Sequence, residues 1–152
     1  MTNQLVMELD AAQSFLAAPH IGMLAVARRS GPPIASPVWY GYEPGGSITF
    51  FTGTQGRKSR KAELVETAGV LSLTVQREEF PYKYVTVEGS LVGSDRPPSP
   101  EQMLAIVGRY LPEEGARGFV EAELAHPGSG PVHFTVRPDR WLTFDFSDED
   151  GS

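Results

Sequence analysis

The sequence predicts a mainly β protein with helices (α+β), built on six or seven antiparallel strands that form a barrel or a strongly coiled sheet. Three observations lead to this fold class. Several short runs alternate apolar and polar residues with the two-residue period of a strand that is buried on one face. Turn residues separate these runs at short intervals. Helical spacing is confined to the start of the chain, one crossover and a late region, which disfavours a doubly wound parallel sheet.

The composition fits one compact domain. A chain of 152 residues is long enough for a single hydrophobic core and too short for two ordinary ones. Glycine and proline are frequent, with 16 and 13 copies, but a hydrophobic content of 40% argues against disorder. We therefore expect a single domain over residues 1–147, followed by an acidic tail, 148–152, that frays in solvent.

Several function classes are disfavoured by composition. The chain has no cysteine, so it can form neither disulfides nor thiolate metal sites, and a cytoplasmic location is expected. The longest apolar run, 21–27, is far below the roughly 20 residues that span a bilayer. A net charge of −6 opposes general affinity for nucleic acid. The three histidines lack metal-ligand spacing, so no metal site is expected.

The first third of the chain contains one helix and three strands. Apolar residues recur at helical spacing over 8–18, which predicts a short amphipathic helix. The apolar run 21–28 reads as a buried strand, and 48–53 as another. Between them, 34–43 has strand character, but it contains Pro37, which cannot donate a ladder hydrogen bond. That strand is therefore expected at an edge or with a bulge.

The middle of the chain predicts a crossover helix and a strand pair. Residues 57–66 have helical character, and Gly69 suits the left-handed position just beyond a helix end. The runs 71–76 and 84–91 both alternate with a period of two, and we expect them to pair as antiparallel neighbours.

A second helix has a strong start signal. Ser99 suits the N-cap, Pro100 the first helical position and Gln102 the third, which together predict a capping box. The apolar positions that follow form one wide face: Met103, Leu104, Ile106, Val107, Tyr110 and Leu111.

The last third predicts a weaker helix and two closing strands. Residues 116–124 have helical spacing, and the Gly- and Pro-containing segment after them ends it. Alternation over 132–137 and again over 142–146 predicts two strands, separated by the turn-like sequence Pro-Asp-Arg.

Four cations stand within five positions of this acidic chain, and we call them the basic cluster: Arg57, Lys58, Arg60 and Lys61. In the first turn of a helix they repel one another and the positive end of the helix dipole. A bound phosphate would offset this repulsion, with the hydroxyl of Ser59 as a further donor. The alternative is a solvated face that offsets Glu63 and Glu66. The spacing of a nucleoside-triphosphate phosphate loop is not met.

Two segments carry a family resemblance: "PVWYGYEPGGSITFFTG" and "SRKAELVETAGVLSLTVQREEFPYKYVTVEG". They resemble the pyridoxamine 5′-phosphate oxidase-like, FMN-binding split-barrel superfamily, especially its actinobacterial FMN- or F-420-dependent oxidoreductases. The resemblance covers about residues 10 to 95 well and the last third by pattern alone. It implies a split barrel that forms a homodimer, with two cofactor sites at the subunit interface.

The resemblance also implies cofactor-binding residues. The strand end and the Ser-Arg-Lys segment that hold the cofactor phosphate correspond to Phe51, Thr52, Ser59, Arg60 and Lys61. The register is open, because Arg57 and Lys58 could play the same part.

Residues near the cofactor ring follow from the same resemblance. Ser36, Val38 and Trp39 would lie beside the ring system. Gln76, Lys83 and Tyr84 could reach the cofactor, from the same chain or from the partner subunit. Tyr82, with Trp39 and Tyr84, could form a wall of the substrate pocket.

The chain departs from true pyridoxamine-phosphate oxidases at recognisable positions. Those enzymes carry an Arg and a Lys where this chain has approximately Ser36 and Gly41, and segment 136–147 does not reproduce their C-terminal Arg/Trp segment. Vitamin B6 oxidation is therefore not expected.

The functional prediction is an FMN- or F-420-dependent oxidoreductase that transfers hydride between the cofactor and an unidentified small molecule. No catalytic residue is assigned, and the sequence does not separate FMN from F-420. The alternatives are a non-catalytic protein that binds FMN, F-420 or haem, and a dimer whose site no longer binds these ligands. A Ser-His-Asp hydrolase is disfavoured because the nucleophile-elbow motif is missing.

Overall fold

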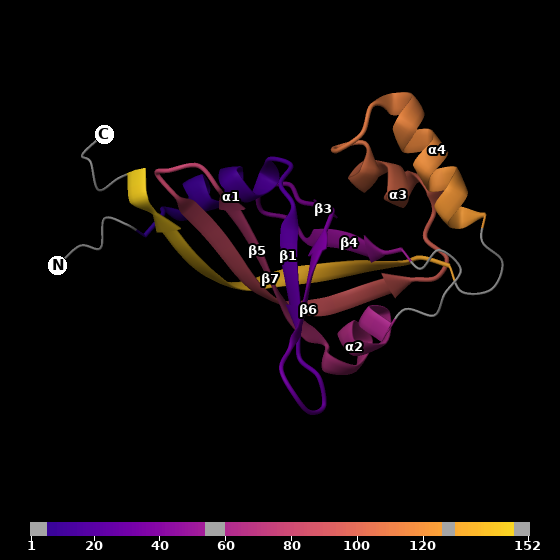
Figure 1. Ribbon diagram of the computed structural model, residues 1–152, viewed down its shortest axis with the longest axis horizontal. Helices are drawn as coiled ribbons and strands as arrows, with labels where there is room; N and C mark the ends of the chain where they lie inside the picture. Colours follow the sequence, from indigo (N-terminus) through magenta and orange to yellow (C-terminus); the bar gives the residue numbers. More distant parts are fainter. Residues whose placement is uncertain (1–5, 54–59, 126–129, 148–152) are drawn as a thin grey trace.

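The computed structural model describes residues 6–53, 60–125 and 130–147. Within these residues, seven strands form one antiparallel sheet and four helices pack around it (Figure 1). The α+β fold class and the six- to seven-stranded split barrel are therefore confirmed. None of the helices in this part of the chain is long and apolar enough to cross a membrane.

The sheet is curled so that its two edges meet. Its strands are, in spatial order, β2 (Ile34–Val38), β1 (Gly22–Val26), β5 (Val70–Arg77), β6 (Lys83–Asp95), β7 (Val132–Asp145), β4 (Ile48–Thr52) and β3 (Tyr40–Gly41). The two edge strands, β2 and β3, are separated in the chain by Trp39 alone. We call this meeting point, residues 38–40, the seam. The edge position of β2 confirms the prediction, made from Pro37, that this strand lies at an edge of the sheet or has a bulge.

The main core fills the inside of the curled sheet. Strand residues that point inward pack with α1 (Leu9–Ala17) and α2 (Arg60–Ala68). Ala12 and Leu16 bury the inner face of α1, whereas Leu9, which shares their helical period, is largely exposed. The largest fully buried side chains are Tyr40, Phe50, Phe134, Leu16, Leu24, Ile48 and Leu73.

A second apolar cluster lies on the outer face of β4. Because neighbouring strand residues point to opposite faces, Phe50 enters the main core and Phe51 faces outward. Two helices, α3 (Pro100–Val107) and α4 (Glu113–Leu124), pack on Phe51. Figure 1 shows this helix pair at the end of the sheet opposite the two termini, with α2 at the same end.

Several local predictions are confirmed. The strands at 71–76 and 84–91 pair in register, with the hydroxyl oxygens of Thr74 and Thr86 2.7 Å apart. Both hydrogen bonds of the capping box are present: the Gln102 backbone N–H donates to the Ser99 hydroxyl, and the Ser99 backbone N–H donates to Oε1 of Gln102. Gly69 ends α2 with a φ of 70°, a conformation that glycine adopts without strain.

Three predicted boundaries were wrong. The strand at 34–43 is divided at Trp39 into β2 and β3. The predicted helix through Leu111 ends at Val107, although Tyr110 and Leu111 still pack on the second cluster. The two closing strands are one strand, β7.

A bulge explains why β7 is continuous. The register with β6 shifts between Glu88 and Gly89, which leaves Asp139 as an extra residue on β7. Asp139 is held by the Ser90 hydroxyl at 2.5 Å and by Nε of Arg137 at 2.9 Å. A Cβ at Gly89 would lie 2.7 Å from the Arg137 carbonyl oxygen, so the bulge needs glycine on the facing strand.

The Tyr40 hydroxyl ties the seam to α1, and its removal should weaken the fold. It donates to the carbonyl oxygen of Leu16 at 2.6 Å, and the carbonyl of Ala18 lies 3.0 Å away. We expect Tyr40→Phe to lower the free energy of unfolding by about 1–2 kcal/mol, because buried carbonyls lose their donor. Urea unfolding measures this change in the free energy of unfolding. Tyr82→Phe is the control, since Tyr82 is 50% exposed, and an equal loss in both variants would contradict the role.

His133 should make stability fall in mild acid. Its side chain is 5% exposed, and its Nδ1 lies 3.6 Å from the Asp95 carboxylate. Burial lowers the pKa of His133 below its usual 6.5, and Asp95 opposes this only in part. The unfolded chain therefore takes up a proton more readily as the pH falls through about 6.5, and the folded state loses stability.

Replacing His133 should reduce the dependence of stability on pH. Urea unfolding of the wild type and of His133→Asn at about pH 7.5 and about pH 5.5 would measure it. We expect the variant to lose less stability on acidification than the wild type. An equal or larger loss would show that His133 does not carry the effect.

Candidate functional site

A cavity of about 420 Å³ lies at the seam, between the barrel and the α3–α4 pair. It is lined mostly by apolar and aromatic side chains. The lining residues are Ile21, Pro37, Val38, Trp39, Phe51, Gly53, Lys61, Phe119 and Glu123. They come from the residue before β1, the end of β2 and the residue after it, the end of β4 and the residue after it, the first turn of α2 and one face of α4. The volume is in the range of small-molecule sites.

Aromatic rings form one continuous wall of this cavity. Trp39 is stacked on Tyr110, with 5.1 Å between ring centroids and an interplanar angle of 7°. Its other neighbour is Phe119, at 5.3 Å. The Tyr110 hydroxyl donates to the His20 carbonyl at 2.7 Å, which fixes the ring under Trp39. The indole is thus held by packing before any ligand enters.

Two charged side chains line this otherwise apolar space. Lys61 is half-buried at the start of α2, and burial lowers the pKa of its ammonium group. Glu123 on α4 is 7% exposed. A Cβ at Gly53 would lie 2.8 Å from Oε1 of Glu123, so the carboxylate occupies space that only glycine leaves free. Both charges are partly removed from water, which makes each attractive to a complementary ligand group.

Two buried hydroxyls belong to residues that are next to lining residues in the sequence: Ser36 precedes Pro37, and Thr52 follows Phe51. Within the residues that the structure describes, Oγ of Ser36 and Oγ1 of Thr52 are buried without a hydrogen-bond partner. Thr52 is 1% exposed and follows Phe51, so the two side chains point to opposite faces of β4. Unpaired buried hydroxyls of this kind are uncommon in folded proteins.

The structure brings four of the residues suggested by the resemblance into one cavity: Val38, Trp39, Phe51 and Lys61. Ser36 and Thr52 are next to lining residues in the sequence, on β2 and β4. Arg60 is the exposed first residue of α2. Ser59 lies outside the described residues, as do Arg57 and Lys58 of the basic cluster.

The other three suggested residues lie at the far end of the sheet. Gln76 and Tyr84 face each other across β5 and β6 near the turn that joins them. Figure 1 shows this turn beside α1 and the termini, away from α2 and α4. Their exposed side chains share the outer face of the sheet, so a role at this cavity would need a partner subunit.

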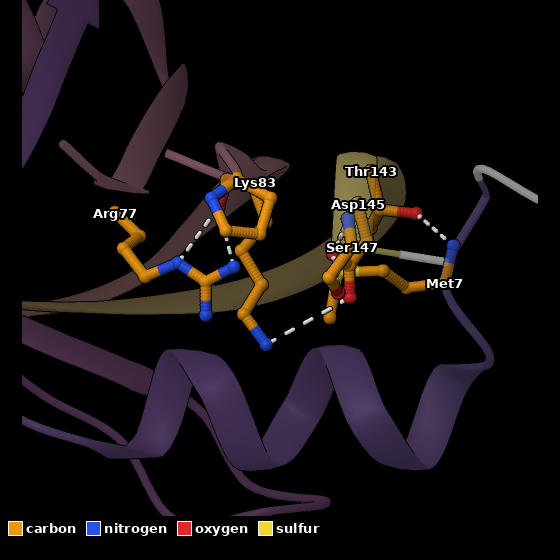
Figure 2. Close-up of polar contacts among 7 residues, drawn as sticks. Met7, Arg77, Lys83, Thr143, Asp145 and Ser147 are labelled. Atoms are coloured by element: carbon orange, nitrogen blue, oxygen red, sulfur yellow. Dashed lines mark hydrogen bonds and ion pairs between the residues drawn. The ribbon is translucent and has the colours of Figure 1, made fainter. Parts of the chain in front are cut away.

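Lys83 points to the opposite face from Tyr84. Its ammonium group lies 3.8 Å from the Asp145 carboxylate and 4.9 Å from the centre of the Phe15 ring on α1. Figure 2 shows this ion pair above α1, with Ser147 donating to the same carboxylate. These contacts give Lys83 a structural role within its own chain. Its predicted part in cofactor binding remains a prediction.

Sequence reasoning did not select four of the lining residues: Ile21, Pro37, Phe119 and Glu123. Phe119 and Glu123 are four positions apart on a predicted helix, so they share a face. That spacing could have grouped them. It does not reveal that the face covers the end of β4, because the packing of α4 depends on residues distant in the sequence.

Taken together, the site suits a flat ligand that carries an anionic group. The aromatic wall offers stacking surface, and Lys61 with the start of α2 offers positive charge. Burial makes the Lys61 charge costly in isolation, so an anion beside it would be favourable. An aromatic wall together with a nearby cation fits a phosphorylated planar cofactor.

Comparison with solved structures places the fold among known proteins. A conserved hypothetical protein of Mycobacterium tuberculosis is 19% identical, with 99% of this chain and 92% of that chain covered and a TM-score of 0.73. An F420 reductase is 22% identical over 86% and 94% of the two chains, with a TM-score of 0.58. A FAD-binding protein from Mesorhizobium loti is 18% identical over 91% and 93%, with a TM-score of 0.60. These likenesses show a shared fold.

Sequence comparison assigns the family. No curated protein matches the chain. The family profile described as pyridoxamine 5′-phosphate oxidase matches residues 9–139, which include the whole barrel up to the bulge of β7 together with all four helices. The chain therefore belongs to the pyridoxamine 5′-phosphate oxidase-like split-barrel family.

Proposed function

We propose that the protein is an FMN- or F-420-dependent oxidoreductase that transfers hydride between the cofactor and a small molecule. The observation that carries this proposal is the cavity at the seam, where an aromatic wall and the half-buried Lys61 stand side by side. The F420 reductase and the FAD-binding protein that share the fold support a flavin-type ligand.

The chain's own residues have distinct parts in this proposal. Trp39, Phe51 and Phe119 would stack against the ring and exclude water from one side of it. Lys61 and Arg60 would contact the phosphate at the first turn of α2, where free backbone N–H groups also point outward. The buried hydroxyls of Ser36 and Thr52 would supply hydrogen bonds at the edge of the site.

A bound flavin or deazaflavin supplies the hydride chemistry, so the protein's task is to bind, orient and exclude solvent. The packed Trp39–Tyr110 pair suits this task because it needs no rearrangement before binding. The remaining open side of the cavity would receive the small-molecule partner.

We further propose a homodimer that packs through the outer face of the sheet. One row of residues crosses five strands in register: Pro37, Met23, Thr74, Thr86 and Leu142. The row carries no charge, and Met23 and Leu142 are 44% and 38% exposed. It begins at Pro37, which also lines the cavity. A partner on this face would therefore border the site.

An aromatic group beside this row supports the same assembly. Five rings contact one another around the β5–β6 turn and the end of β7: Phe80, Tyr82, Phe146, Phe144 and Tyr84. Phe80 is 72% exposed and Tyr82 is 50% exposed. In a dimer, Gln76 and Tyr84 of one subunit could reach the other subunit's cavity, as the resemblance implies.

Removal of the Lys61 charge should weaken cofactor binding without weakening the fold. We expect Lys61→Ala to bind FMN or F-420 about tenfold or more weakly, because a charge-assisted contact is worth about 1.5–3 kcal/mol. The free protein should keep its stability, since a partly buried charge is lost. Quenching of tryptophan fluorescence measures the affinity, and Trp39→Phe should remove much of the signal.

Arg117→Ala is the matched control, because Arg117 is an exposed cation on α4. If Arg57→Ala or Lys58→Ala weakens binding while Lys61→Ala and Arg60→Ala do not, the phosphate contact lies earlier in the basic cluster. A wild-type protein that binds neither cofactor would refute the proposed function. Binding without electron exchange, after reduction by dithionite and addition of an acceptor, would favour the non-catalytic alternative.

A charge on the outer face should disrupt the dimer. We expect Met23→Lys to shift the protein from dimer to monomer in sedimentation-velocity runs, because the uncharged row would have to bury an ammonium group. Val6→Lys, at another exposed apolar position, serves as the control. A wild-type protein that sediments as a monomer, or a Met23→Lys variant that remains dimeric, would contradict this interface.

A further inference from the structure

We propose that Glu123 is a specificity-determining residue of the cavity, whose carboxylate accepts a hydrogen bond from a ring N–H of the cofactor. The inference rests on the proposed function and adds the chemical feature that the cavity selects. The ligand class is a planar heteroaromatic ring that carries an anionic group toward Lys61 and an N–H donor toward Glu123.

Glu123 lies in the wall of the cavity. It lies on the inner face of α4, four residues after Phe119, and both side chains line the cavity. Its 7% exposure contrasts with the exposed Glu121 two positions earlier on the same helix. The carboxylate is therefore part of the cavity wall and not part of the solvated face of α4.

The backbone opposite Glu123 is shaped to admit it. A Cβ at Gly53 would lie 2.8 Å from Oε1, 3.3 Å from Cδ and 3.4 Å from Oε2. All three contacts are with the carboxylate group itself. Gly53 immediately follows β4, whose Phe51 forms another part of the wall. The end of β4 thus brings the backbone against the carboxylate and fixes where its oxygens lie.

The Glu123 carboxylate stands in a mostly apolar cavity. A carboxylate removed from water is costly unless it accepts hydrogen bonds, and it offers about four acceptor positions. It can therefore accept from a ligand in addition to contacts within the protein. An anionic cofactor would be repelled by Glu123 unless a donor of that cofactor faced it. Both isoalloxazine and its deaza analogue carry an N–H on their pyrimidine edge, which is such a donor.

Replacement of Glu123 tests whether its carboxylate strengthens or weakens cofactor binding. FMN and F-420 are titrated into the wild type, Glu123→Ala, Glu123→Gln and the control Glu121→Ala. We expect Glu123→Ala to weaken binding about tenfold or more, because a hydrogen bond to a charged group is lost. Glu123→Gln, which keeps an acceptor, should lose less, and Glu121→Ala should match the wild type. Simple repulsion predicts the reverse, with tighter binding in Glu123→Ala.

A modified flavin identifies the donor. FMN methylated at ring N3 lacks the N–H, so we expect the wild type to bind it about as weakly as Glu123→Ala binds FMN. Isotope-edited infrared difference spectra give a second readout for either cofactor: the carboxylate band should shift on binding in the wild type, and this shift should be missing in Glu123→Gln. Thermal unfolding of each free variant checks the fold, and Glu123→Gln carries the test if Glu123→Ala does not fold.

The outcomes separate this inference from the proposed function. Suppose that the wild type binds the cofactor, that Lys61→Ala weakens this binding and that Glu123→Ala does not. Only the inference about Glu123 is then overturned. Equal affinity of the wild type for FMN and its N3-methyl derivative overturns it as well. If the wild type binds neither cofactor, the proposed function and the inference fail together.

Discussion

The fold depends on one constraint at the seam. Val38 ends one edge strand of the sheet and Tyr40 begins the other, with only Trp39 between them. Two residues of extended chain span about 7 Å, so the two edges must meet and the sheet must curl. Because successive side chains alternate in direction, Val38 and Tyr40 both belong to the main core, whereas Trp39 between them packs on Tyr110 and Phe119. Tyr40 also bonds to α1, and Val38 also lines the cavity. The closure of the barrel and the site therefore share one stretch of chain.

The site retains charges that stability alone would not favour. Lys61 and Glu123 both stand in an apolar cavity, where partial desolvation costs free energy for each. An uncharged pair of similar volume would pack there at lower cost. Buried charges of this kind are typical of functional sites, where a ligand adds contacts to those that the fold supplies. The α3–α4 pair matters for the same reason, since it contributes Phe119 and Glu123 while burying its own apolar residues on Phe51.

Local signals in the sequence predicted much of the fold. Alternation was sufficient for the β5–β6 pair, and the capping residues at Ser99 for the start of α3, because both depend on nearby residues. The continuity of β7 was not predictable in this way. It depends on Gly89 of the neighbouring strand, which gives room for the bulge at Asp139. The cavity divides similarly: the family resemblance had named Trp39, Phe51 and Lys61, whereas Glu123 joins them only because α4 folds back over the end of β4.

The seam also bears on which reaction the cavity could host. True pyridoxamine-phosphate oxidases carry a lysine at approximately the position of Gly41. In this chain Gly41 pairs with Thr49, and a Cβ at Gly41 would lie 2.7 Å from the Thr49 hydroxyl oxygen and 3.5 Å from Ile106 of α3. A Cβ at Gly41 would therefore require the Thr49 side chain to shift, whereas the approach to Ile106 is an ordinary contact. The tight packing at Gly41 supports the expectation that this member of the family does not oxidise vitamin B6.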